Sequence, residues 1–125
     1  MIDTHVLLWW VLASPNLSNR AEALLRDDAN EIFVSAISAF EIANKHRLGK
    51  LPEATPLIEN FEEVVHSQKF QVAKLTAAQG LRAGQILSDH RDPFDRIIAV
   101  QAMDLAIPVI TVDAKIASLG ADTLW

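Results

Sequence analysis

Short apolar segments of strand length alternate with longer stretches of helical pattern along the whole chain. The strand-like segments are residues 1–2, which form only the end of a strand, and then 32–34, 70–75, 108–112 and 123–125. Helical segments of ten or more residues separate most of these strands, so the connections are crossovers and the strands are expected to run parallel. The predicted fold class is therefore α/β, a three-layer α/β/α sandwich around a mainly parallel central sheet.

Helix starts and stops are set by capping residues and breakers. Ser35 or Ser38 begins a helix that Gly49 ends, and Ser38 with Glu41 matches a capping box. The other helices expected from caps and apolar spacing are residues 6–12, 18–26, 55–67, 76–87 and 114–119, together with one that Asp92 opens.

The composition fits one domain, residues 1–125, because half of the 125 residues are hydrophobic and supply a core. The absence of cysteine excludes disulfides and thiolate metal sites and suits the cytoplasm. No apolar run approaches the roughly 20 residues that span a bilayer, so no membrane association is expected. The net charge of -5 argues against a protein that coats nucleic acid, although a nuclease whose acids bind a cation remains compatible with it.

The segment from His90 to Ala102 (HRDPFDRIIAVQA) opens an apolar helix with a dense charged cluster. Asp92 is suited to cap the helix, Pro93 to occupy its first position, and Asp95 to interact with the helix dipole in the first turn. Two acids and two arginines within six residues exceed what capping needs. A buried helix that holds such an acidic end firmly is typical of a metal or catalytic site.

Three more acids follow predicted strands. Asp3 follows residues 1–2, Asp113 follows 108–112, and Glu41 lies one turn into the helix after 32–34. Ligands of parallel sheets bind outside the carboxyl ends of the strands, so these acids and Asp95 are expected to share one crevice. Taken singly, each has a structural explanation: Asp3 and Asp113 as helix caps, and Glu41 as a partner of Ser38 or Lys45. Their convergence instead favours a site for a hard cation such as Mg²⁺ or Mn²⁺.

These motifs together resemble PIN-domain ribonucleases, specifically the VapC-type toxins of bacterial toxin–antitoxin pairs. The matching pieces occur in family order over essentially the whole chain: DTHVLLWW at 3–10, SAISAFEIANKHRLGKL at 35–51, HRDPFDRIIAVQA at 90–102, VITVD at 109–113, and Leu124 with Trp125. DTH alone is weak, whereas HRDPFDR joined to an apolar helix and then TVD is highly specific.

The resemblance implies an endoribonuclease that depends on Mg²⁺, with Mn²⁺ as the alternative, and whose partners are an RNA substrate, a cognate antitoxin and a second copy in a homodimer. Asp92 is expected to cap or support the site, and Thr111 to hydrogen-bond a carboxylate or water. Only Met1 and Ile2 precede Asp3, where the family usually has several apolar residues, so either the chain begins further upstream or the support of Asp3 is weakened. The family's catalytic and metal-binding acids fall on Asp3, Glu41, Asp95 and Asp113.

Basic residues near the acids are candidates for RNA phosphate contacts, because an acidic metal site needs countercharge for RNA. Several also have structural explanations, such as dipole compensation or an Arg96–Asp92 ion pair. His5 and His90 suit proton transfer or simple packing, and Trp9 and Trp10 suit the core, a homodimer face or an antitoxin groove. The predicted RNA contacts are Lys45, Arg47, Lys50, Arg91 and Arg96.

Two other classes of protein compete with the nuclease. A receiver-like or other noncatalytic α/β binding module would use its acids as caps or for a regulatory metal, but Asp3 stands alone where a receiver has paired acids. A phosphatase of the haloacid dehalogenase type requires DxDx at the first strand, where this chain has DTHV. A cation shared by Asp3, Asp95 and Asp113 distinguishes the nuclease from both.

Overall fold

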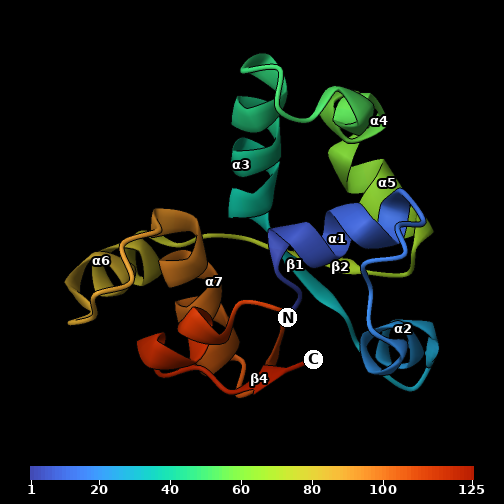
Figure 1. The fold of residues 1–125 in the computed structure, drawn as a ribbon. Helices are drawn as coiled ribbons and strands as arrows, with labels where there is room; N and C mark the ends of the chain where they lie inside the picture. Colours follow the sequence, from blue (N-terminus) through green and yellow to red (C-terminus); the bar gives the residue numbers. More distant parts are fainter.

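The computed structural model describes residues 1–125 and contains a parallel sheet crossed by helices (Figure 1). The strands are β1 (Phe33–Ser35), β2 (Gln71–Ala73), β3 (Val109–Ile110) and β4 (Thr123–Leu124). β1 pairs with β2 and β3 pairs with β4, while Ile2 forms parallel bridges to Val34 and to Ile110. The order across the sheet is therefore β2, β1, Ile2, β3, β4, and every pairing is parallel, as predicted.

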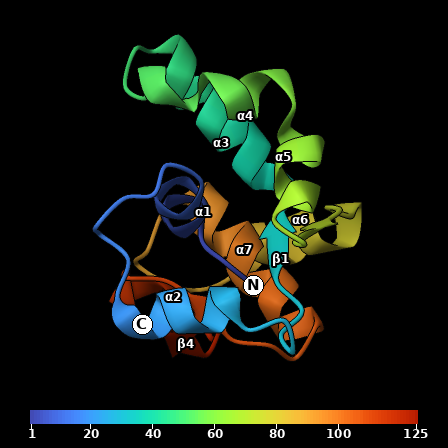
Figure 2. The same ribbon diagram turned by 90° about the vertical axis from the view of Figure 1, so that its right-hand side faces the viewer.

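The helices lie on both faces of this sheet, and α3, α4 and α5 form one group, of which α3 contacts α7 (Figures 1 and 2). None of the helices combines the length and the apolar character needed to cross a membrane. Their bounds are α1 Thr4–Val11, α2 Asn19–Arg26, α3 Ala36–Arg47, α4 Thr55–Glu59, α5 Phe61–Ser67, α6 Ala77–Gln85 and α7 Pro93–Asp104, with 3₁₀ helices η1 Pro52–Ala54 and η2 Ala114–Leu119.

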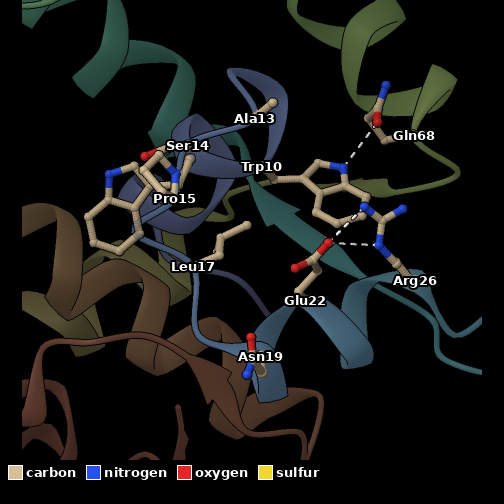
Figure 3. A pocket seen from close by; sticks show the side chains of 10 residues that line it. Trp10, Ala13, Ser14, Pro15, Leu17, Asn19, Glu22, Arg26 and Gln68 are labelled. Carbon is tan, nitrogen blue, oxygen red and sulfur yellow. Dashed lines mark hydrogen bonds and ion pairs between the residues drawn. The ribbon is translucent and has the colours of Figure 1, made fainter.

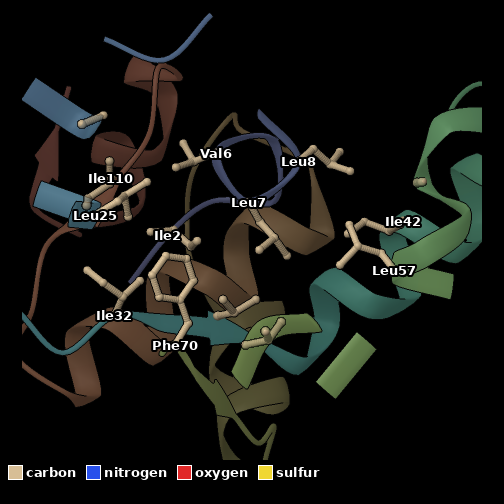
Figure 4. Packing of buried hydrophobic residues seen from close by; sticks show 14 residues of the cluster. Ile2, Val6, Leu7, Leu8, Leu25, Ile32, Ile42, Leu57, Phe70 and Ile110 are labelled. Carbon is tan, nitrogen blue, oxygen red and sulfur yellow. The ribbon is translucent and has the colours of Figure 1, made fainter. Parts of the chain in front are cut away.

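Two hydrophobic clusters lie on opposite faces of the sheet. Ile2, Val34 and Ile110 join the cluster formed with α1 to α5 (Figure 4). Met1 and Val109 join the other cluster, formed with α7 and η2. Successive residues of a strand point to opposite faces, so this division follows directly from the strand pattern. The two clusters make the α/β/α layering that the sequence predicts.

Ser35, one of the two residues predicted to begin the helix that Gly49 ends, does begin it, whereas the predicted Ser38–Glu41 capping box and the single helix over 55–67 were wrong. The side chain of Ser35 caps α3 by accepting a hydrogen bond from Ile37 N–H, whereas Ser38 lies inside the helix and its Oγ is 2.9 Å from Thr4 Oγ1. The capping box expected from Ser38 and Glu41 is therefore absent. The helix expected over 55–67 is interrupted at Asn60, whose extended φ of -146° separates α4 from α5.

The start of α7 agrees with the prediction. Asp92 Oδ1 accepts hydrogen bonds from Phe94 N–H at 2.9 Å and Asp95 N–H at 3.5 Å, and Pro93 occupies the first helical position. The helix then buries Ile98 and Ala99 completely. Because its body is held in the core, α7 provides a rigid support for the acid in its first turn.

Candidate active site

Four acids from separate segments line one cavity of about 630 Å³ at the carboxyl edge of the sheet. Asp3 caps α1 directly after the central strand, and Asp113 follows β3. Asp95 lies in the first turn of α7, and Glu41 lies in α3. The structure thus places the four residues expected to share a crevice around one cavity, while the group of three possible ligands that lie within 4.8 Å of one another is His90, Asp95 and Asp113.

Asp3 is the most firmly held of these acids, with only 2% of its surface exposed. Thr111 Oγ1 donates a hydrogen bond of 2.8 Å to Asp3 Oδ2, and His5 N–H is 3.3 Å from Oδ1. Burial alone raises the pKa of Asp3, but the His5 and Thr111 interactions outweigh it and lower the pKa below its ordinary value. The hydrogen bond expected from Thr111 to a carboxylate is therefore present, and Asp3 stays ionised.

The pKa of Asp95 is shifted in the opposite direction from that of Asp3. Burial, aided by the negative charges of Asp3 and Asp92, raises its pKa to about 6, although a contact of 2.7 Å between its Oδ2 and His90 Nε2 opposes this. A buried carboxyl among like charges is costly without a counterion. One ligand atom each from His90, Asp95 and Asp113 lie within 4.8 Å of one another, which is a spacing suited to a bound cation.

Glu41 and Asp113 combine structural contacts with their place in the cavity. Lys45 Nζ donates to Glu41 Oε1 at 2.6 Å, so the expected pair one helical turn apart is present. Asp113 Oδ1 accepts from Lys115 N–H at 2.8 Å and caps η2. Each carboxylate oxygen has more than one lone-pair site, so the hydrogen bonds that Asp3 and Asp113 accept are compatible with binding a cation.

Arg96 has a different role from the RNA contact expected for it. Its guanidinium donates to four backbone carbonyls, one in the last turn of α6 and three in the segment between α6 and α7, at distances of 2.9 to 3.1 Å, and forms no ion pair with Asp92. The acceptors are the carbonyl oxygens of Ala83, Ile86, Ser88 and His90. Four of its five N–H donors are engaged in this way, so Arg96 holds the connecting loop and is not proposed as an RNA contact.

The other basic residues differ in their availability. Lys45 is paired with Glu41, and Arg47 Nη2 donates to Asn44 Oδ1 at 2.9 Å. Lys50 and Arg91 are exposed and make no side-chain hydrogen bond or ion pair. Lys115 is exposed and lines the acid cavity, yet it was not among the predicted contacts. Its position two residues after Asp113 was the available signal.

A second cavity, of about 410 Å³, lies beside α1 and α2 (Figure 3). Trp10 Nε1 donates to Gln68 Oε1 at 3.0 Å, and the guanidinium of Arg26 lies 5.3 Å from the centre of a Trp10 ring. Trp9 lines both this cavity and the acid cavity. Only one carboxylate, Glu22, lines the second cavity, and it is paired with Arg26, so no cation site is formed there.

Two substitutions at Asp92 separate its capping role from its charge. We expect Asp92→Ala to lower the free energy of unfolding by about 1 kcal/mol, because two helical N–H groups lose their acceptor. Asp92→Asn keeps a cap and is expected to change stability by less than about 0.5 kcal/mol, while lowering the pKa of Asp95 through loss of a nearby negative charge. Urea unfolding and NMR titration of the carboxyl carbons measure the two effects. Equal destabilisation by both substitutions would contradict the capping role.

Comparison with known proteins agrees with this architecture. Residues 1–121 match the family model described as PIN domain. The chain is also 27% identical over 119 residues to a protein named Ribonuclease VapC22 from Mycobacterium tuberculosis, covering 94% of this chain and 89% of that relative. The match spans all five acids that line the cavity, which include Asp92.

Proposed function

Because this chain belongs to the PIN-domain family, we propose that it is a VapC-type endoribonuclease that requires a divalent metal ion and acts as the toxin of a toxin–antitoxin pair. The observation that carries the proposal is the meeting of four carboxylates from four separate segments in one cavity. Membership of the family also argues against the receiver-like module, whose acids have no reason to converge in this pattern.

The residues present fit a hard cation. Asp3, Glu41, Asp95 and Asp113 supply oxygen ligands, which Mg²⁺ and Mn²⁺ prefer, and the cavity leaves room for water and a phosphate group. Burial, together with the negative charges of Asp3 and Asp92, raises the pKa of Asp95, and a bound cation would favour its ionised form. A divalent ion held by these residues would polarise a phosphate oxygen and lower the pKa of a bound water for attack on the phosphodiester.

The chain itself supplies the positioning. Thr111 holds one oxygen of Asp3, and its Oγ1 also accepts from Asp113 N–H at 2.9 Å, so one hydroxyl links two of the acids. Such supporting hydrogen bonds fix the direction of a metal ligand. Lys115, with Lys50 and Arg91, provides positive charge for RNA phosphates next to an otherwise acidic surface.

The proposed partners follow from the same assignment. A cognate antitoxin would neutralise the enzyme by covering the acid cavity, and two copies of the chain would form a homodimer in the cytoplasm. The pairing is tested by comparing RNA cleavage by the purified protein alone with cleavage after the antitoxin is added. We expect the antitoxin to inhibit cleavage at an equimolar ratio.

The activity is tested by incubating the purified chain with single-stranded RNA in Mg²⁺, in Mn²⁺ and in excess EDTA. Cleavage within the RNA is expected with either ion and none with EDTA, and adding back the ion is expected to restore it. Cleavage that persists undiminished in EDTA would contradict the metal requirement. No cleavage of a broad RNA pool with any divalent ion would contradict the nuclease assignment.

Lys115→Ala tests the proposed phosphate contact. We expect RNA binding to weaken roughly fivefold at low salt, without a change in base preference. The slope of the logarithm of the binding constant against the logarithm of salt concentration is expected to become shallower by about one. Binding titrations in Ca²⁺ at several salt concentrations measure this. Lys74→Ala is the matched control, because Lys74 is exposed and does not line the acid cavity. Equal effects of the two substitutions would show that Lys115 contributes only general charge.

A further inference from the structure

We propose that His90 supplies a nitrogen ligand to the metal ion, alongside the carboxylates. This inference rests on the proposed metal-dependent function and adds a ligand to it. The side chain of His90 is 11% exposed and lines the same cavity as the four acids. Its Nε2 lies 2.7 Å from Asp95 Oδ2 and is the ring atom nearest to that carboxylate.

The distances agree with ligands of a single ion. With bonds of about 2.1 Å in octahedral geometry, neighbouring ligand atoms are separated by about 3 Å and opposite ones by about 4.2 Å. The 2.7 Å between His90 Nε2 and Asp95 Oδ2 is close to the separation of neighbours. The ligand atoms of His90, Asp95 and Asp113 all lie within 4.8 Å, so only a small contraction brings them around one cation.

The backbone of His90 is held in place from both sides. Its N–H donates to Ser88 Oγ at 3.2 Å, and its carbonyl accepts from Arg96 Nε at 2.9 Å. Arg96 belongs to α7, the helix that carries Asp95 in its first turn. The same helix therefore positions both residues, as a preorganised ligand pair requires.

A nitrogen ligand changes which ions the cavity prefers. Mg²⁺ and Mn²⁺ both prefer oxygen ligands, but Mn²⁺, as a first-row transition-metal ion, accepts an imidazole nitrogen more readily than Mg²⁺ does. We therefore expect the ratio of Mn²⁺ to Mg²⁺ affinity to exceed that of the same cavity without His90. Replacing His90 with glutamine is expected to lower this ratio by about tenfold, mainly through weaker Mn²⁺ binding.

Pulsed electron paramagnetic resonance of the Mn²⁺-loaded chain tests the proposal without any measurement of activity. Echo modulation from ¹⁴N directly bonded to Mn²⁺ is expected in the wild type and in His5→Gln, and is expected to be lost in His90→Gln. His5 is the matched control because it also lines the cavity and interacts with Asp3. Circular dichroism of His90→Gln checks that the variant folds, and His90→Asn provides a second variant of different length.

The outcomes are distinct. Mn²⁺ bound without nitrogen coupling, in a chain that cleaves RNA, would overturn the ligand role of His90 and leave the proposed function intact. Coupling that is lost in His5→Gln instead would assign the nitrogen to His5 and also overturn it. Absence of Mn²⁺ binding together with absence of RNA cleavage would overturn both the ligand role and the proposed function.

Discussion

Asp95→Asn is expected to reduce RNA cleavage by about a hundredfold or more, while making the metal-free protein more stable near neutral pH. The loss follows because an amide replaces a charged ligand, and metal-assisted phosphoryl chemistry contributes several kcal/mol. The gain in stability follows because burial, with the charges of Asp3 and Asp92, raises the pKa of Asp95 to about 6. An ionised Asp95 therefore costs free energy in the folded chain that a neutral asparagine does not.

The sign of this effect gives it a pH dependence. Asp95 titrates near its ordinary pKa of 3.8 in the unfolded chain and at about 6 in the folded one, so the folded state binds more protons between these values. The free energy of unfolding therefore falls as pH rises from about 4 to about 6, because Asp95 ionises less readily in the folded chain than in the unfolded one. Thermal melting in EDTA is expected to show this decline for the wild type and a smaller one for Asp95→Asn.

Added Mn²⁺ is expected to reverse the order of stability. Binding of the ion to the folded wild type and not to the unfolded chain is expected to raise the melting temperature with ion concentration, whereas Asp95→Asn is expected to respond weakly. A variant that cleaves RNA at the wild-type rate would contradict the ligand role of Asp95. A variant that is less stable than the wild type in EDTA at neutral pH would contradict its electrostatic cost.

Arg96→Ala is expected to lower the free energy of unfolding by about 3 to 5 kcal/mol and to reduce RNA cleavage, although Arg96 contacts no RNA in this account. Hydrogen bonds involving a charged group contribute about 1.5 to 3 kcal/mol each and are not additive. Arg96 makes four of them, one to the Ala83 carbonyl in the last turn of α6 and three to carbonyls of the loop that follows. Without them, the loop that carries His90 loses its anchor, and the cavity loses its arrangement.

Two other substitutions serve as comparisons for Arg96→Ala. Urea unfolding measures the stability of each variant, and RNA cleavage rates measure its activity. Arg96→Lys is expected to recover only part of the stability, because an ammonium cannot reproduce the planar fork of donors. Arg91→Ala removes a neighbouring arginine that is exposed and unpaired, so its stability is expected to stay within about 0.5 kcal/mol of the wild type. An Arg96→Ala chain as stable as Arg91→Ala would contradict the anchoring role.

The sheet and the meeting of the acids were predictable because they depend on local signals. Strand-length apolar runs separated by helices dictate parallel strands, and parallel strands place Asp3 and Asp113 at one edge. The apolar pattern of α7 and the Asp92 cap then place Asp95 beside them. Such features depend on neighbours within a few residues, so one sequence is enough to predict them.

The contacts of Arg96 were not predictable in the same way. Its acceptors are backbone carbonyls whose direction depends on how the loop after α6 closes, and no residue type marks them. The same applies to Ser38, which meets Thr4 across the fold rather than capping its own helix. The break at Asn60 depends on how α4 and α5 pack, and the local apolar spacing gave no sign of it.

The most direct test of the four-carboxylate metal site is a crystal structure of the chain soaked with Mn²⁺, with anomalous scattering measured at the manganese edge. We expect a strong anomalous peak in the acid cavity, with oxygens of Asp3, Asp95 and Asp113 about 2.1 to 2.3 Å from it. Glu41 is expected to face the same ion, either directly or through water. A saturated crystal with no peak in this cavity, or with these acids too far apart to share an ion, would contradict the account.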